Sequence, residues 1–145
     1  MDLGLAGKVA VITGGSQGIG KATAIAMGSE GTSVAICARN HDRLNHAAQQ
    51  IRDVTGTQVL ALQADIRYPD QIEHFITATV ARFGRLDILV NNAGEPATGP
   101  LLETSDLVWA DDLDVKLFGA IRCSRLAIPH MMAASGGRII NVTSI

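Results

Sequence analysis

The sequence predicts an α/β fold: a doubly wound parallel sheet in three layers, with helices covering both faces. Short β-branched runs alternate with longer amphipathic stretches along all 145 residues. The apolar runs are continuous, which is typical of strands buried on both faces. The first run is closed by glycines, as expected where a strand turns into a helix. A chain of this length forms one domain, so we expect residues 1–145 to be a single unit.

Five segments have the length and composition of strands. They are residues 8–13, 33–38, 58–63, 86–91 and 137–144. No helical stretch follows the last of them, which would leave a central strand with one face poorly covered. We therefore expect a domain that is truncated after the fifth strand and incomplete at its C-terminus.

Four segments have the helical spacing of apolar residues. They cover residues 18–27, 40–54, 68–84 and 106–134. Pro69 near the start of the third and Gly84 just past its end fit the usual asymmetry of helix termini. The apolar faces predicted for the first three helices are Ile19, Ala22, Ala26 and Met27; Leu44, Ala47, Ala48, Ile51 and Val54; and Ile72, Phe75, Ile76, Val80 and Phe83.

The composition argues against several classes of protein. The formal net charge is -2, which gives no reason to expect nucleic acid or an anionic membrane as a partner. Cys37 and Cys123 are far apart in the sequence, so they provide neither a disulfide framework nor metal-ligand spacing, and we expect no metal. The N-terminus lacks the pattern of a signal peptide, and no apolar run approaches the length of a membrane span. We therefore expect a cytoplasmic protein.

The glycine-rich loop TGGSQGIGKAT, residues 13–23, admits two interpretations. A nucleoside-triphosphate loop would use Gly15, Gly20 and Lys21, but Ala22 replaces the hydroxyl residue that such a loop needs for Mg²⁺. Lys21 is more simply explained as a solvated residue of the first helical turn.

The alternative is a dinucleotide-binding turn of the Rossmann type, which lies between a first strand and a first helix. Gly14 would permit the tight turn, Gly18 would let the backbone approach a pyrophosphate, and Gly20 would let the helix pack closely on the strand. The free N–H groups of the helix N-terminus favour phosphate, and Ser16 can add a hydroxyl donor. We favour this interpretation, although a glycine motif alone is also compatible with a turn that binds nothing.

Two further strand ends bear on the choice of dinucleotide. Domains that prefer NAD usually carry an acid at the end of the second strand, and this chain has Arg39. An Arg fork suits a ribose 2′-phosphate and no carboxylate there would repel it, so NADP(H) is favoured and NAD(H) is possible. At the end of the third strand, Asp65 can accept a hydrogen bond from an adenine amino group, and the Ile66 amide can donate one to the ring. The plainer interpretations are a surface charge for Arg39 and a helix cap for Asp65.

A fourth motif, NNAG (91–94), directly follows the fourth strand. Paired Asn side chains can bond to the backbone and fix neighbouring loops, and Gly94 leaves room for a flat ring or a ribose. Together with the glycine loop, Asp65 and GRIINVTS (137–144), this motif resembles the short-chain dehydrogenase/reductase family over the whole chain. The resemblance implies hydride transfer between a nicotinamide and a small carbonyl or alcohol substrate. The expected cofactor site comprises Gly14, Ser16, Gln17, Gly18, Ile19, Gly20, Arg39, Asn40, Asp65, Ile66, Asn91, Ala93 and Gly94.

The resemblance also implies catalytic residues, with departures from the family pattern. Ser144 matches the catalytic serine, which hydrogen-bonds the substrate oxygen. The family's Tyr-x-x-x-Lys motif lies beyond that serine and this sequence ends at Ile145, so we expect the 145 residues alone to be inactive. Lys116 replaces an Asn that holds a water of the proton relay; it is either a working substitute or a Lys with its stem in the core. Gln17 stands where many NADP-preferring members carry a second basic residue.

Two hypotheses follow for the function. The first is an NADP(H)-dependent oxidoreductase, and the second is a dinucleotide-binding module without catalysis. Because members of the family often form dimers or tetramers, we expect a homodimer or homotetramer of the full-length protein.

Overall fold

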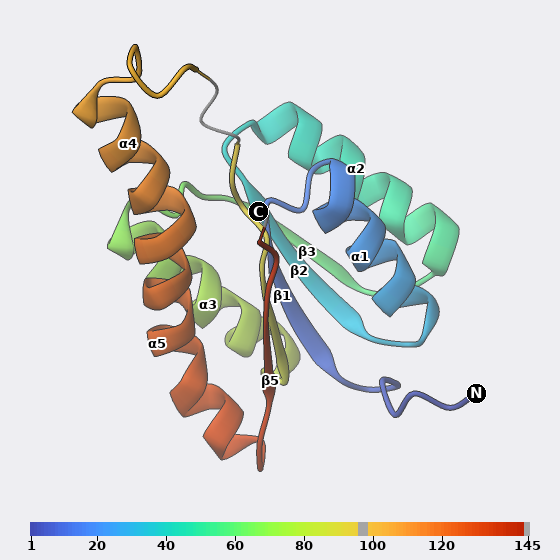
Figure 1. Ribbon diagram of the computed structural model, residues 1–145. Coiled ribbons are helices and arrows are strands. Elements are labelled where there is room, and N and C mark those ends of the chain that lie inside the picture. Colours follow the sequence, from blue (N-terminus) through green and yellow to red (C-terminus); the bar gives the residue numbers. More distant parts are fainter. Residues whose placement is uncertain (96–98, 144–145) are drawn as a thin grey trace.

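Five parallel strands form a single sheet at the centre of the protein (Figure 1). The structure is a computed structural model that describes residues 1–95 and 99–143. The strands are β1 (Val9–Thr13), β2 (Ser33–Ala38), β3 (Val59–Gln63), β4 (Ile88–Asn91) and β5 (Arg138–Asn141). Their spatial order is β3-β2-β1-β4-β5. The direction of winding reverses between β1 and β4, so the doubly wound sheet predicted from the sequence is confirmed.

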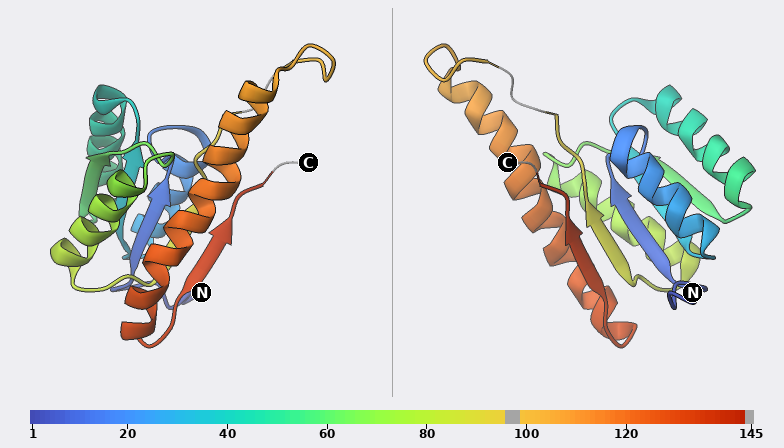
Figure 2. Two further views of the ribbon diagram at one scale, coloured as in Figure 1. Left: turned by 90° about the vertical axis from the view of Figure 1, so that its left-hand side faces the viewer. Right: turned by 45° about the vertical axis from the view of Figure 1, so that its right-hand side comes forward.

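Helices cover both faces of the sheet and complete the three layers (Figure 2). They are α1 (Gly18–Ser29), α2 (His41–Thr55), α3 (Pro69–Phe83), α4 (Asp106–Leu113), the π-helical turn η1 (Asp114–Phe118) and α5 (Gly119–Ala133). The helices α1 and α2 lie on one face, and α3 lies on the other beside the long helix formed by α4, η1 and α5. None of the helices in the described part of the chain is long and apolar enough to cross a membrane.

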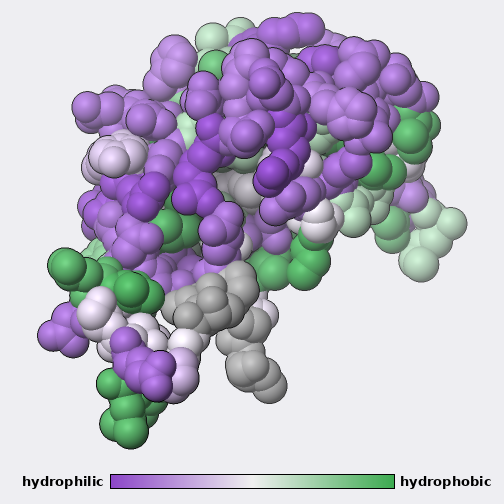
Figure 3. Space-filling model, turned by 90° about the horizontal axis from the view of Figure 1, so that it is seen from above, coloured by the Kyte–Doolittle hydropathy of each residue, from purple (hydrophilic) through white to green (hydrophobic). Residues whose placement is uncertain are grey.

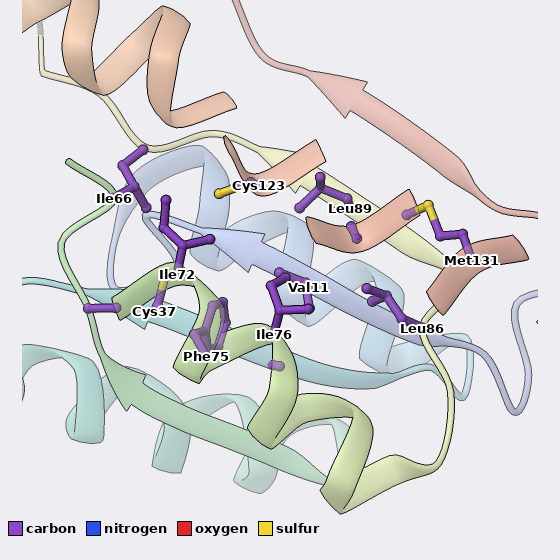
Figure 4. Packing of buried hydrophobic residues seen from close by; sticks show 13 residues of the cluster. Val11, Cys37, Ile66, Ile72, Phe75, Ile76, Leu86, Leu89, Cys123 and Met131 are labelled. Atoms are coloured by element: carbon purple, nitrogen blue, oxygen red, sulfur yellow. The ribbon is translucent and has the colours of Figure 1, made fainter. Parts of the chain in front are cut away.

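Successive residues of β1 point to opposite faces of the sheet and enter two separate hydrophobic cores. Val11 packs in the first core with Phe75 of α3 and Met131 of α5 (Figure 4). Ile12 packs in the second core with Leu44 of α2. The continuous apolar run of the first strand is therefore explained by burial on both sides.

The buried face of α1 differs from the prediction. Ile19 is 62% exposed, and Ala22 and Ala26 are also exposed. The residues that are buried are Gly20, Ala24 and Gly28. Because these residues have little or no side chain, the helix backbone itself approaches its neighbours and leaves no hydrophobic pattern. Of the predicted face, Met27 is partly buried and packs against the second core.

The apolar faces of the next two helices are largely as predicted. On α2, Leu44, Ala47, Ala48 and Ile51 are buried. Val54 is an exception, since this residue of the last turn is 66% exposed. On α3, Ile72, Phe75 and Ile76 are buried, while Val80 and Phe83 are partly buried and pack against the first core.

The fourth predicted helix, residues 106–134, is not one continuous α-helix. Between α4 and α5 the chain forms the π-helical turn η1. A π turn accommodates an additional residue in the helix, and such turns are frequent at functional sites. Lys116 lies in this turn.

The strands at one side of the sheet are shorter than predicted. The strand β4 begins at Ile88 instead of residue 86, and β5 ends at Asn141 instead of residue 144. The strand β5 forms one edge of the described sheet, and all four of its residues are exposed.

Candidate dinucleotide-binding site

The candidate site lies at the carboxyl edge of the sheet, toward which all strand arrows point in Figure 2. Ligands of doubly wound folds bind at this edge, where the strand order reverses, which here is between β1 and β4. Seen from this side, the surface is mostly hydrophilic, with hydrophobic residues at the lower left, near the centre and along the right-hand side (Figure 3). A polar surface at the strand ends suits a charged ligand.

The glycine loop has the geometry expected of a phosphate-binding turn. Gly14 and Gly18 have φ values of 66° and 54°, in the left-handed region that favours glycine. A Cβ added to Gly18 would meet nothing within 4 Å, so the backbone is open at the start of α1. A Cβ added to Gly20 would instead overlap the Asn92 side-chain nitrogen and the Gly14 carbonyl oxygen. Gly20 thus permits α1 to pack closely against the glycine loop and the loop after β4. The sequence had suggested that it packs on the strand.

Thr13 and Asn92 tie the glycine loop to the loop after β4. The backbone N–H groups of Asn92 and Ala93 both donate to Thr13 Oγ1, each at 3.0 Å. The Asn92 side-chain amide donates to the carbonyl oxygens of Thr13 at 3.0 Å and Gly14 at 3.2 Å. The expectation that an Asn of the NNAG motif fixes neighbouring loops is confirmed for Asn92. Thr13 has an equal part in this contact, which the sequence did not reveal.

Asn91, the last residue of β4, contacts β5 and α5 through its side chain. Its Nδ2 donates to Asn141 Oδ1 at 2.8 Å and to Ser124 Oγ at 3.3 Å. Its Oδ1 is buried and has no hydrogen-bond partner among the described residues. A buried amide oxygen of this kind is available to a donor from a water or a ligand.

An open cleft of about 610 Å³ lies between these strand ends and the helix formed by η1 and α5. Of the predicted site residues, it brings together Ile66, Asn91, Ala93 and Lys116. The residues predicted for the phosphate side, from Ser16 to Gly20 and at Arg39 and Asn40, lie outside this cleft. The predicted site therefore consists of a cleft beside β4 and a separate phosphate-binding rim beside β1 and β2.

Arg39 at the end of β2 does not lie free of carboxylates, which corrects the expectation from the sequence. Its Nη2 lies 2.7 Å from Glu95 Oε1, in the loop that follows β4. The two side chains are 53% and 73% exposed. Because β1 lies between β2 and β4, this ion pair spans the end of β1, from which the glycine loop emerges.

A second arginine reaches the same rim from α2. Arg43 Nη1 donates to Gln17 Oε1 at 3.1 Å, directly before Gly18. Asn40, predicted to contact the cofactor, is the N-cap of α2, where its side-chain oxygen accepts the Arg43 backbone N–H at 2.8 Å. Lys21, expected to be solvated, has a hydrogen-bond partner in Gln50.

Asp65 at the end of β3 is held by an arginine network. Its carboxylate accepts from Arg67, with the closest contact at 2.6 Å, and Arg67 also pairs with Asp111 of α4 at 2.7 Å. Burial acts to raise the pKa of the Asp65 carboxyl, but hydrogen bonds from Arg67 outweigh it and lower that pKa. Asp65 does not cap the next helix, because the N-cap of α3 is Tyr68.

Lys116 crosses the NNAG loop. Its Cγ and Cε lie 3.2 and 3.3 Å from the position of a Cβ added to Gly94, so the stem covers this glycine. Its ammonium pairs with Asp112 at 2.6 Å, one turn earlier in the helix. Ser144, predicted to be catalytic, lies outside the described residues.

Both cysteines are buried in the first core and are free thiols. Burial raises the pKa of Cys37 and raises that of Cys123 to about 12, so neither is a thiolate near neutral pH. Within residues 1–95 and 99–143, no group of His, Cys, Asp and Glu side chains could hold a metal ion.

Comparison with known families identifies the chain. The family model described as short chain dehydrogenase matches residues 8–145. The chain belongs to the short-chain dehydrogenase family. Among relatives of this family, the 3-oxoacyl-(acyl-carrier-protein) reductase of Synechocystis is 35% identical over 144 residues, or 97% of this chain and 57% of the relative. The corresponding reductase of Staphylococcus epidermidis is 34% identical over 139 residues, or 95% of this chain and 57% of the relative. The chain thus spans a little over half the length of these relatives.

Solved structures of other oxidoreductases share the fold. L-Sorbose reductase from Gluconobacter frateurii, complexed with NADPH and L-sorbose, matches with a TM-score of 0.91 and 38% identity, over 96% of this chain and 53% of that one. NAD+-bound xylitol dehydrogenase matches with a TM-score of 0.91 and 29% identity, over 97% of this chain and 54% of that one. Solved structures similar to this chain therefore contain either dinucleotide.

Proposed function

We propose that this chain binds NADP(H) at the carboxyl edge of its sheet, as the cofactor-binding part of an oxidoreductase that acts on a small carbonyl or alcohol. The observation that carries the proposal is Arg39, a cation at the end of β2, beside a glycine loop that is open at Gly18. Dinucleotide domains that prefer NAD usually have an acid at this strand end. A guanidinium fork there instead favours the 2′-phosphate.

The residues of the rim and cleft fit such a cofactor. The open backbone at Gly18 gives a pyrophosphate access to the N–H groups at the start of α1. Asp65 is ionised and held by Arg67, so its carboxylate can also accept from an adenine amino group. Asn91 lines the cleft beside β4, and its buried Oδ1, which has no hydrogen-bond partner among the described residues, could accept from a donor on the nicotinamide half.

When bound, the cofactor would supply or accept the hydride, and the chain would supply binding and orientation. Arg39 would bind the 2′-phosphate, and Thr13 and Asn92 would hold the loops on both sides of the cofactor in register. Ser144 would orient the reacting oxygen of the substrate through its hydroxyl.

Lys116 has two proposed roles, and its variant separates them. If the ammonium holds a water of a proton relay, Lys116→Asn in the full-length protein should change the pH dependence of carbonyl reduction. If the stem over Gly94 and the pair with Asp112 are its whole role, Lys116→Asn should lower thermal stability and leave the pH–rate profile unchanged.

The preference for NADP(H) is tested by titrating the purified protein with NADPH and NADH and following nicotinamide fluorescence. We expect NADPH to bind more tightly and Arg39→Ala to remove most of the difference. Arg82→Ala on α3 is the matched control, since this exposed residue stacks over Phe83 away from the site. Equal dissociation constants for the two dinucleotides, or an unchanged ratio in Arg39→Ala, would contradict the proposal.

We also propose that copies of the chain associate through α4 and α5. The helix α4 has no buried residue, and it exposes the large apolar residues Leu107, Trp109 and Leu113; α5 exposes Ile121, Ile128 and Met132. Apolar patches of this kind are typical of protein interfaces. Light scattering coupled to size-exclusion chromatography should report a dimer or tetramer, and Leu107→Glu should shift it toward the monomer. A monomer at micromolar concentration would refute the association.

A further inference from the structure

The rim of the glycine loop carries a second cation besides Arg39. Arg43 is the third residue of α2, and the Asn40 side chain fixes its backbone by accepting its N–H. From this position its guanidinium donates to Gln17 Oε1 at 3.1 Å, so a positive charge from α2 lies beside the residue directly before Gly18. The contact joins two elements that are 26 residues apart in the sequence.

The two arginines differ in how their charge is balanced. Arg39 pairs with the carboxylate of Glu95, whereas the partner of Arg43 is a neutral amide. Among the salt bridges of residues 1–95 and 99–143, none involves Arg43. The neighbouring acid, Asp42, is fully exposed and bonds to the ring of His41.

A guanidinium has five N–H donors in a planar fork, and the bond to Gln17 uses one of them. The remaining N–H groups of Arg43 can donate to an anion at the rim without breaking the contact that positions the side chain. A phosphate monoester carries nearly two negative charges at neutral pH, which one arginine does not neutralise. Two arginines four positions apart, at the end of β2 and in the first turn of α2, match that charge.

We propose that Arg43 is a second specificity-determining residue for the 2′-phosphate of NADP(H), positioned by Gln17. This inference rests on the proposed function and deepens it, because it assigns the dinucleotide preference to two arginines instead of one. Gln17 brings no charge of its own, but its side-chain carbonyl oxygen holds the guanidinium of Arg43 beside the start of α1.

The experiment measures dissociation constants of the purified protein for NADPH, NADH, 2′,5′-ADP and 5′-AMP. For Arg43→Gln we expect NADPH and 2′,5′-ADP to bind about fivefold more weakly, the upper range for an exposed ion pair. NADH and 5′-AMP, which lack the 2′-phosphate, should bind as they do to the wild type. The matched control is Arg52→Gln, since Arg52 lies in the last turn of the same helix and donates to Val59 O.

Gln17→Glu is a second variant that keeps Arg43 in place. The new carboxylate would pair with the guanidinium and neutralise it, so this variant should weaken NADPH by a larger factor than NADH. It keeps the test informative if Arg43→Gln does not fold, which circular dichroism would report.

Three results would overturn the inference. Arg43→Gln and Gln17→Glu could leave NADPH affinity unchanged while Arg39→Ala lowers it, and the proposed function would then stand with a single arginine. Arg43→Gln could weaken NADPH and NADH equally, which would assign Arg43 to the pyrophosphate or to the loop itself. If the wild type does not prefer NADPH, both the proposed function and this inference fail.

Discussion

Gly18 and Gly20 of the glycine loop should respond differently to the same substitution, because an added methyl group meets different surroundings at the two positions. In Gly20→Ala the new Cβ would overlap the Asn92 side-chain nitrogen and the Gly14 carbonyl oxygen. Relieving such an overlap costs about 1–3 kcal/mol, and displacing Asn92 gives up hydrogen bonds to Thr13 O and Gly14 O at roughly 1 kcal/mol each. We therefore expect Gly20→Ala to lower the free energy of unfolding by about 3–5 kcal/mol.

Gly18→Ala is the matched substitution two residues earlier, and its new methyl would meet no atom within 4 Å. Its cost to the fold is the left-handed backbone at φ 54°, which an alanine adopts at a penalty of about 1 kcal/mol. The methyl would, however, occupy the open space at the start of α1 where we place the pyrophosphate. Gly18→Ala should therefore lose NADPH affinity at least about tenfold, or 1.4 kcal/mol, with only a small loss of stability.

Urea unfolding followed by circular dichroism measures the free energy of unfolding of each variant. Fluorescence titration with NADPH at low temperature measures its affinity for the cofactor. We expect the two variants to differ in opposite ways: Gly20→Ala should mainly lose stability, and Gly18→Ala should mainly lose NADPH affinity. If Gly20→Ala unfolds like the wild type, the close packing of α1 on the loops is refuted. If Gly18→Ala binds NADPH normally, the pyrophosphate does not lie against this loop.

Two further predictions concern carboxylates. Glu95→Gln should free Arg39 and tighten NADPH about two- to fivefold while leaving NADH unchanged, as titration will show; an unchanged NADPH affinity would mean that Glu95 does not compete with the phosphate. Asp87, whose side chain is 6% exposed, accepts from Arg85 and from Val9 N–H, so Asp87→Asn should cost about 1–3 kcal/mol of stability at pH 7 in urea unfolding. Burial acts to raise the pKa of Asp87, but the bonds from Arg85 and Val9 outweigh it and lower that pKa. The contribution of Asp87 is therefore present above the unfolded pKa of about 3.9 and is lost as pH falls through the folded value, so the difference between wild type and variant should shrink between pH 5 and pH 3. A difference that stays constant over this range would contradict the role of the charge.

Much of the fold was predictable because its signals are local. A buried strand needs a short apolar run, and a helix end needs a residue such as Gly84, which adopts the left-handed conformation at the end of α3. These requirements act between residues close in sequence, and the order of strands and helices followed from them. The same local rules failed on α1, where the buried positions are Gly20, Ala24 and Gly28. Close approach of the backbone leaves no hydrophobic pattern to detect.

The sequence by itself determined the elements of this short-chain dehydrogenase domain, the glycine loop at the first strand end and Arg39 at the second. Only the tertiary structure decided which residues contact one another. Asn92 is hydrogen-bonded to Thr13, Glu95 pairs with Arg39, and Arg43 donates to Gln17. The physical reason is the parallel sheet, which places β1 between β2 and β4 and so brings together loops that are up to 80 residues apart. Side chains that are far apart along the chain become neighbours at that edge, and no local pattern records which of them will meet.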